Sequence, residues 1–416
     1  MWRGPNNDGV SPETNAPLVW SGAANVRWRT PLGADGGNST PVIWNDQIFV
    51  TQSYTNKRSL SGIDRRSGKP RWSVFATSKG REPTQLMNPY CSSSPATDGE
   101  KVYAWFGTAG MYAFDLAGKP MWERDLGIQS HQFGYGSSPV IVSNTLFLNF
   151  GPGALEYVVA LDKRNGLELW RVKSPVPAVD DTYGTWSTPH YLVHEGKPQV
   201  LVALRDYFAA LNPDTGEEIW RCRGLGVQAK ASPYAGSGVA LISGDFRGGE
   251  IAVKLGGKGD VTDSHRLWRE YPPRGRIATS IVVGKHLYGA RANGIIDCLD
   301  LETGDVVWEK RFPGGSANSA IFASPILVGG LLYFVNQGGD VAIVEARPEY
   351  KLVGVNSVKE RCNASLAVAY GDLYIRTWRA LWCIRSPTPS ESNAAATPNP
   401  PGLPAPTNSA KPRPRP

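Results

Sequence analysis

The sequence predicts an all-β fold, namely an eight-bladed β-propeller built of four-stranded antiparallel blades. Two observations lead to this prediction. A motif recurs in which glycine follows a polar residue after four positions and tryptophan follows it after eight. A small-small-Pro triplet, or a near variant of it, opens each repeat at intervals of 40 to 54 residues. Four short strands per repeat at such a period are typical of propeller blades.

The stretch 295–308 shows the recurring motif most clearly. It predicts a strand, a tight turn at 302–304 and a second strand that ends on a large aromatic residue. Gly304 suits the left-handed backbone that a short hairpin loop needs. We expect each tryptophan to be wedged between neighbouring blades, with stacking on a sugar or cofactor as the alternative. The other copies are Asp64-Gly68-Trp72, Asp162-Gly166-Trp170, Asn212-Gly216-Trp220 and the shorter Asp115-Gly118-Trp122.

Eight opening triplets predict eight blades. Each is followed by alternating apolar residues, β-branched side chains and glycine-containing turns, as expected for strands. Blade five contains an irregular run at 255–265, which we expect to be a surface loop or a partner-contact loop. The triplets are Ser39-Thr40-Pro41, Ser93-Ser94-Pro95, Ser137-Ser138-Pro139, Ser187-Thr188-Pro189, Ala231-Ser232-Pro233, Ala278-Thr279-Ser280, Ala323-Ser324-Pro325 and Asn363-Ala364-Ser365.

The two ends of the repeat region are expected to complete one another. Residues 25–28 look like the end of a repeat whose beginning is missing, and the eighth repeat stops near Ile384 without a closing strand. We therefore expect the N-terminal strand to complete the last blade and remove its open edge. The predicted organisation is a strap at 1–24, the propeller at 25–386, and a disordered tail rich in Pro, Ala and Ser at 387–416.

Composition and charge narrow the function classes. The formal net charge of +7 is spread thinly, with no basic run inside the repeats, so no nucleic-acid partner is predicted. No apolar run is long enough to span a membrane. No signal peptide is visible, and the sequence leaves open whether a presequence has been removed. The five cysteines are scattered and form no CxxC pair, so we expect buried free thiols. We expect a monomer.

A ligand site, if the propeller has one, is expected beside the central channel. The loop before the first strand of a blade and the loop between its second and third strands emerge there on one face. Polar and aromatic residues in these loops favour an anionic or hydrogen-bonding ligand, with a solvated rim of paired charges as the alternative. The candidates are His131, Tyr135, Asp181, Trp186, Arg205, Asp206, Arg247, Arg276, Arg291 and Arg376.

Catalytic and metal-binding residues are not predicted. His190 and His194 lie in a strand pattern, where four residues span about 13 Å, too far for one metal ion. A carbohydrate-active propeller would need paired carboxylates at the channel mouth, which the sequential neighbours Asp180 and Asp181 do not favour.

The repeat resembles a known family. A strand opened by Ser-Ser-Pro and followed by Ala-Leu-Asp-x-x-Thr-Gly-x-x-x-Trp is similar to the pyrroloquinoline-quinone-like (quinoprotein alcohol dehydrogenase-like) propeller repeat, most closely at 160–170 and 210–220. The resemblance covers 25–386, and residues 2–11 and 256–262 further resemble a bacterial subfamily without settled activity. The family includes quinone-dependent alcohol dehydrogenases and also the propeller lipoprotein of the outer-membrane β-barrel assembly machinery, which has no cofactor.

The differences between this chain and the dehydrogenases favour a protein like the assembly lipoprotein, which has no cofactor. The dehydrogenases are longer and carry an adjacent Cys-Cys pair under the quinone, which this chain lacks, and no calcium ligand set can be placed. The first hypothesis is therefore a non-catalytic binding or assembly scaffold without a cofactor, holding a protein partner or small ligand on the loop face. The resemblance places it in the periplasm or another extracytoplasmic compartment. The alternative is a quinone-dependent alcohol dehydrogenase that uses pyrroloquinoline quinone with calcium.

Overall fold

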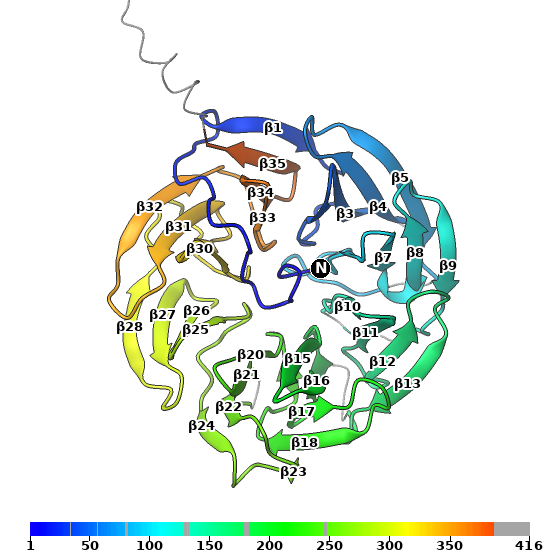
Figure 1. The fold of residues 1–416 in the computed structure, drawn as a ribbon. Coiled ribbons are helices and arrows are strands. Elements are labelled where there is room, and N and C mark those ends of the chain that lie inside the picture. The colour runs from blue at the N-terminus through cyan, green and yellow to red at the C-terminus, as the bar shows by residue number, and fades with distance from the viewer. Residues whose placement is uncertain are drawn as a thin grey trace, which may run out of the picture. The chain divides into compact units, whose positions relative to one another are not determined.

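Eight antiparallel blades stand around a common centre in the computed structural model, which describes residues 1–33, 35–55, 57–79, 82–128, 131, 133–178, 183–244 and 248–386 (Figure 1). Residues 1–386 form one compact unit. The predicted eight-bladed all-β propeller is confirmed. The disordered tail predicted at 387–416 lies outside the described residues.

Each blade is a meander of neighbouring strands, and its first strand lies nearest the centre of the ring (Figure 1). Blade one comprises β2 (Val42–Trp44), β3 (Gln47–Tyr54), β4 (Lys57–Asp64) and β5 (Pro70–Thr77). Blade two comprises β6 (Ala96–Thr97), β7 (Lys101–Trp105), β8 (Met111–Asp115) and β9 (Pro120–Arg124). Blade three comprises β10 (Val140–Val142), β11 (Thr145–Phe150), β12 (Tyr157–Asp162) and β13 (Glu168–Lys173). Blade four comprises β15 (His190–His194), β16 (Lys197–Leu204), β17 (Tyr207–Leu211) and β18 (Glu218–Arg223).

The second half of the ring repeats this arrangement. Blade five comprises β20 (Tyr234–Gly236), β21 (Val239–Ser243), β22 (Glu250–Lys254) and β24 (Arg266–Glu270). Blade six comprises β25 (Ile281–Val283), β26 (His286–Ala290), β27 (Ile295–Asp300) and β28 (Val306–Arg311). Blade seven comprises β29 (Ile326–Val328), β30 (Leu331–Val335), β31 (Asp340–Glu345) and β32 (Leu352–Ser357). Blade eight comprises β33 (Ala367–Ala369), β34 (Asp372–Arg376), β35 (Ala380–Arg385) and β1 (Val26–Pro31).

Blade eight contains both ends of the repeat region. β1 pairs antiparallel with β35, and Trp28 stands opposite Cys383. The closure predicted from the orphan N-terminal segment is therefore confirmed. Because β1 covers the outer edge of β35, the last blade has the same four strands as the others.

Short elements complete the ring. A turn of 3-10 helix, η1 (Gly107–Ala109), joins β7 to β8. A two-stranded parallel sheet, β14 (Gly184–Thr185) with β19 (Gln228–Ala229), ties together the loops that precede blades four and five. Among the described residues, no helix has both the length and the apolar character required to cross a membrane.

The irregular run at 255–265 in blade five joins this blade to blade four. Its residues form β23 (Gly259–Asp260), which adds a fifth strand to blade four by pairing parallel with β18. The Arg223 side chain also donates to the Asp260 carboxylate at 3.1 Å, and Val261 is fully buried. The run therefore stabilises the junction of blades four and five in addition to forming a surface loop.

The recurring tryptophans fill the junctions between blades, as predicted. Trp122 packs on the turn glycine of the next blade, Gly166, and its indole N–H donates to the Lys163 carbonyl at 2.9 Å. Trp220 differs, because its indole donates to Gln199 of its own blade at 3.0 Å. The same bond to the next blade's turn is made by Trp28, Trp72, Trp170, Trp268 and Trp308.

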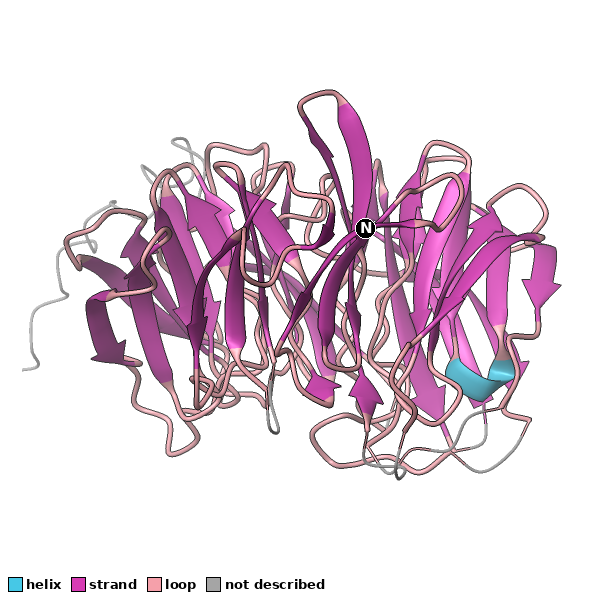
Figure 2. Ribbon diagram, turned by 90° about the horizontal axis from the view of Figure 1, so that it is seen from below, coloured by secondary structure: helices cyan, strands magenta, loops and turns pink. Residues whose placement is uncertain are grey.

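The strap 1–24 crosses one face of the ring and brings the N-terminus to its centre (Figure 1). Val10 forms a β-bridge with Leu327 on the innermost strand of blade seven. Glu13 accepts a hydrogen bond from the backbone of Gly371, in the turn between the first two strands of blade eight. Trp20 is buried with the apolar residues of blades seven and eight. The strap therefore lies at the end of the blades opposite to the loops that open them. Figure 2 shows the turns and loops gathered at the two faces.

Candidate functional site

The central channel contains a cavity of about 240 Å³. Its wall is formed by the opening residues of the blades, and the loops that precede the blades supply Asn38, Met87, Phe133 and Lys230. Trp2 of the strap also lines it. The wall carries hydroxyls, amides, aromatic rings and one lysine, and among the described lining residues there is no Asp or Glu.

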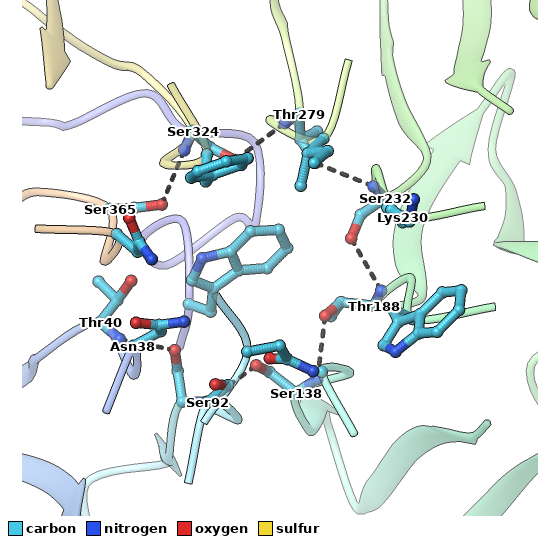
Figure 3. Close-up of a pocket in the computed structure, with 18 of the residues that line it drawn as sticks. Asn38, Thr40, Ser92, Ser138, Thr188, Lys230, Ser232, Thr279, Ser324 and Ser365 are labelled. Carbon is cyan, nitrogen blue, oxygen red and sulfur yellow. Dashed lines mark hydrogen bonds between the residues drawn. The ribbon is translucent and has the colours of Figure 1, made fainter. Parts of the chain in front are cut away.

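One hydroxyl from each blade contributes to this wall, and we call the set the hydroxyl ring. From blade to blade, the backbone N–H of one ring residue donates to the side-chain oxygen of the next at 2.8 to 3.1 Å (Figure 3). The bonds link the innermost strands of successive blades, each contributing about 0.5–1.5 kcal/mol. The members are Thr40, Ser94, Ser138, Thr188, Ser232, Thr279, Ser324 and Ser365.

The hydroxyl ring was missed by the sequence reasoning, although a signal for it was present. In seven opening triplets the ring residue is the second one, always Ser or Thr. In the eighth blade the ring residue is Ser365, so the structural opening begins one residue later than the predicted triplet. The triplets therefore mark a hydrogen-bonding position and not only the start of a strand.

An aromatic group stands on one side of the channel. Trp186 lines the cavity, and its indole N–H donates to the Gly134 carbonyl at 2.8 Å. His131 packs edge-on against Trp186 with ring centres 4.8 Å apart, and Phe133 lies 6.0 Å from the same indole. The parallel pair β14–β19 positions Trp186, since Trp186 N–H donates to the Ala229 carbonyl directly after it. Of the predicted candidates, Trp186 thus reaches the cavity and His131 supports it.

The strap closes the channel from the opposite side. Arg3, next to Trp2, is buried and donates to the carbonyls of Thr279 and Ser280 at 2.9 and 2.8 Å. The imidazole Nδ1 of His190 lies 3.2 Å from the Asn7 carbonyl, to which it can only donate. Burial, aided by the charge of Arg3, lowers the pKa of His190 to about 4. A neutral histidine therefore holds the strap in place.

Two predicted arginines form a buried ion-pair network between blades five and six. Arg276 donates to Glu250 at 2.9 Å and to both oxygens of Asp297 at 2.8 and 2.9 Å. Arg291 donates to Asp297 at 2.9 Å and to Glu309 at 2.8 Å. Although burial opposes ionisation, these carboxylates raise the pKa of Arg276. The guanidinium groups are thereby occupied by carboxylates and do not line the channel cavity.

Arg205 is likewise paired inside the fold. It donates to the carbonyls of Val176 and Gly153 and lies 3.4 Å from the Glu156 carboxylate. Burial raises the pKa of Glu156 to about 7. Both residues border a second cavity of about 480 Å³ at the side of blade three, separate from the channel lining. For the loops beside the channel, the sequence left open the alternative that their charges are paired with one another. Arg205, Arg276 and Arg291 are paired in this way.

The remaining candidates differ in position. Tyr135 packs edge-on against Trp105 with ring centres 5.1 Å apart, and it lines a small cavity between blades one and two. Asp206 forms a turn with φ of 66° between the second and third strands of blade four. Arg376 is buried beside the channel and donates to the carbonyl and hydroxyl oxygens of Ser39. Asp181 and Arg247 lie outside the described residues.

The described residues offer neither a reactive cysteine nor a metal-ligand cluster at the channel. All five cysteines are buried and free, and burial raises the pKa of Cys91 and Cys362 to about 12. Across the described ranges, no three His, Cys, Asp or Glu side chains gather into a potential metal site.

Comparisons with known proteins agree with this fold. The sequence matches the family "Outer membrane protein assembly factor BamB" over residues 19–155 and 154–392. A curated relative of that name from Kangiella koreensis is 29% identical over 197 residues, which cover 42% of this chain and 46% of the relative. Another from Moranella endobia is 23% identical over 332 residues, which cover 77% of this chain and 69% of the relative. The first match thus spans about half the length of that relative.

Solved structures show the same architecture. BamB from Moraxella catarrhalis superposes with a TM-score of 0.59 at 15% identity, covering 86% of this chain and 96% of that one. A europium-containing methanol dehydrogenase gives a TM-score of 0.65 at 12% identity, covering 90% and 88%. At such identities these likenesses concern the fold alone. Together with the sequence match to both halves of the ring, they confirm the predicted relationship: the chain belongs to the BamB family of pyrroloquinoline-quinone-like β-propellers.

Proposed function

We propose that this protein is a non-catalytic scaffold that helps to assemble outer-membrane proteins from the periplasmic side. The family match over both halves of the ring is the observation that carries the proposal. The curated relatives carry the name outer membrane protein assembly factor.

The partner-binding surface of this scaffold is the loop face. Apolar side chains are exposed there in the loops around blades one to three, where a scaffold would contact another protein. Leu86 and Met87 are 66% and 48% exposed, and Ile128 and Leu155 are 58% and 64% exposed. Burying such side chains against a partner would contribute roughly 1.5–3 kcal/mol for each one fully covered. The partner is a protein of the assembly apparatus.

The alternative, a quinone-dependent alcohol dehydrogenase, receives less support from the channel. The described lining offers no carboxylate to a calcium ion, which prefers carboxylate and carbonyl oxygens. The free cysteines are dispersed through the ring, and the cavity is lined by Trp2 of the strap. The described residues of the channel wall therefore do not fit a quinone with calcium.

Deletion of the gene tests the assembly role. We expect lower amounts of folded outer-membrane proteins in the deletion strain, restored by the intact chain. A double variant, Leu86→Asp with Met87→Asp, should fail to restore them, because two charges would oppose burial at the interface. Leu169→Asp, 52% exposed on the outer strand of blade three, is the matched control and should restore them.

Normal outer-membrane protein levels in the deletion strain would overturn the assembly role. The enzymatic alternative has its own readout: purified protein is incubated with pyrroloquinoline quinone and calcium, and dye-linked alcohol oxidation is followed. Oxidation above the background of protein without quinone would contradict a non-catalytic scaffold.

A further inference from the structure

The outer strand of blade seven, β32, differs from the outer strands of the other blades. It contains no charged residue, whereas each of the others contains one to three. Its third residue is Gly354, whereas the third residue of every other outer strand is tryptophan. Those tryptophans are Trp28, Trp72, Trp122, Trp170, Trp220, Trp268 and Trp308.

Charged side chains on an edge strand hinder its pairing with another strand, and β32 lacks this protection. Leu352, Val353 and Val355 of β32 are 39%, 41% and 41% exposed. β32 therefore presents an uncharged, apolar edge to the outside of the ring. The fourth position shows the contrast best, because β32 has Val355 there, β5 has Ser73, and the other six strands have Arg29, Glu123, Arg171, Arg221, Arg269 and Glu309.

The outer side of β32 is paired with no other strand among the described residues, and β32 lies at the rim of the ring (Figure 1). The strap contacts this strand through a side chain. Asn356 donates to the Leu18 carbonyl and accepts from the Trp20 N–H, each at 2.9 Å. Trp20 is buried between blades seven and eight, a junction of the kind that outer-strand tryptophans fill elsewhere. The strap therefore replaces the missing tryptophan of β32 and leaves the backbone edge of this strand open.

The size of this edge favours a single strand as its occupant. The six residues Leu352–Ser357 give an edge about 20 Å long at roughly 3.3 Å per residue. With a thickness of about 10 Å, such a strip offers about 200 Å². A stable pair of folded proteins buries about 800 Å² on each partner, so this edge by itself is too small to hold a second copy of the chain. One extended segment needs only the backbone ladder and a few apolar contacts.

We propose that the outer edge of β32 binds one extended strand of an outer-membrane protein that has not yet folded, and adds it to blade seven. This inference rests on the proposed assembly role and names its substrate class. Strands of such proteins are about 9–11 residues long and alternate apolar with polar side chains. Their backbone groups have no partner until the neighbouring strands pair with them. β32 supplies the missing hydrogen bonds without placing a charge against the apolar side chains.

A dye-labelled synthetic peptide tests the edge. The peptide alternates threonine and valine and carries a lysine at each end for solubility. In its control, two central valines are replaced by proline, which has no N–H to donate to a ladder. Binding to the full chain is followed by fluorescence anisotropy. We expect the alternating peptide to bind with a Kd of about 100 µM or below, and the proline peptide to bind at least about tenfold more weakly.

Val355→Arg is the decisive variant. It gives β32 a charge at the position where six other outer strands carry one, and Val355 is 41% exposed, so the melting temperature should be preserved. Affinity for the alternating peptide should fall at least about tenfold, because the charge opposes pairing along the edge. Val307→Arg is the matched control. Val307 is 40% exposed on β28, an outer strand that already carries charges, and this change should leave the affinity unaltered.

Weaker peptide binding in Val355→Arg, with normal binding in Val307→Arg, supports the proposal. No binding of the alternating peptide to the unmodified chain overturns it, as does equal binding of the proline peptide or an equal effect of both variants. A dimer in light scattering that Val355→Arg dissociates would assign the edge to a second copy and overturn it too. Binding that appears only after removal of residues 387–416 would assign the edge to the tail, with the same consequence.

The deletion strain separates this proposal from the assembly role itself. Val355→Arg should restore folded outer-membrane proteins less well than Val307→Arg does. Equal restoration by the two variants, in a strain where the deletion lowers these proteins, would overturn strand binding at β32 and leave the assembly role standing. Normal levels in the deletion strain would instead remove the assembly role, and with it the substrate class named for this edge.

Discussion

At the scale of single residues, glycine decides how closely neighbouring blades approach. Gly166 has a φ of 74° in the turn of blade three, where it meets the indole of Trp122 from blade two. A β-carbon built there would lie 2.7 Å from the Trp122 ring. The recurring glycine was predicted for its left-handed backbone. The structure adds that the absent side chain makes room for the tryptophan of the preceding blade.

Gly166→Ala should destabilise the protein more than Gly196→Ala does. The two glycines have nearly equal φ, 74° and 75°, so alanine pays a similar backbone cost at each. Around Gly196 nothing lies within 4 Å of a new β-carbon, whereas at Gly166 the Trp122 ring must move. We expect Gly166→Ala to lose about 1–3 kcal/mol more unfolding free energy, measured by urea denaturation. Equal losses would refute the packing explanation.

His190 gives the fold a dependence on acid. Its pKa falls from 6.5 to about 4 on folding, because burial and then the charge of Arg3 oppose protonation. Since the unfolded chain binds the proton more readily, this contribution is complete above pH 6.5 and is lost as the pH falls toward 4. It amounts to a few kcal/mol, on the order of 3.

The effect of His190 must be isolated with a variant, because Glu156 makes the unfolding free energy depend on pH in the opposite direction. Its pKa rises from 4.5 to about 7 on folding, so its contribution is lost as the pH rises through that interval. His190→Gln should therefore show a smaller loss of unfolding free energy between pH 7 and pH 4 than the unmodified chain, measured by denaturation at each pH. An unchanged pH profile would show that His190 does not carry the effect.

At the scale of secondary-structure elements, one tryptophan from most outer strands fastens the next blade. Trp170 on β13 donates to the Pro213 carbonyl at 2.9 Å and packs on Gly216. The motif spacing was sufficient to predict this wedge. It could not predict that blade four would break the pattern, because β23 reaches Trp220 from the run in blade five.

Trp170→Ala should cost about 3–5 kcal/mol of unfolding free energy, because it removes a large buried ring and a hydrogen bond between blades. The adjacent Leu169→Ala is the control, since Leu169 on the same strand is 52% exposed and should cost well under half as much. Chemical denaturation followed by circular dichroism distinguishes the two. Similar values for both variants would contradict the wedge.

At the scale of the whole molecule, closure of the ring depends on β1. Removing residues 1–31 would leave the outer edge of β35 unpaired in blade eight. We expect this truncated chain to melt at a lower temperature and to self-associate through the free edge, as measured by thermal denaturation and light scattering. A chain lacking only residues 1–24 keeps β1, so it should remain a closed ring without that association. Identical behaviour of both truncations would contradict closure by β1.

Much of the architecture could be predicted because it repeats. Blade number, strand order and the completion of the last blade follow from regular spacing and from one unmatched fragment. The channel was harder to predict, because its wall is assembled from one residue per blade and from the strap. Nothing local to Trp2 or Thr40 indicates that they line the same cavity.

The candidate arginines illustrate the same limit. Loop position alone suggested that Arg205 and Arg276 would reach the mouth. Their partners come from elsewhere in the ring: Glu156 lies in the loop before β12, and Asp297 lies within β27. Ion pairing with these carboxylates holds the guanidinium groups inside the wall of the ring. Sequence gives the charge of a side chain, but its direction depends on which carboxylates the fold brings near.

Pairing of β1 with β35 also constrains how the protein is made. Ribosomes deliver the chain from its N-terminus, so the first strand emerges long before the strand that it must join, which ends at Arg385. At about 5–20 residues per second, β1 waits roughly 20 to 70 seconds with its backbone groups unpaired. The circle can therefore be sealed only after synthesis has passed Arg385, and a chaperone that shields nascent chains would find β1 accessible throughout that interval.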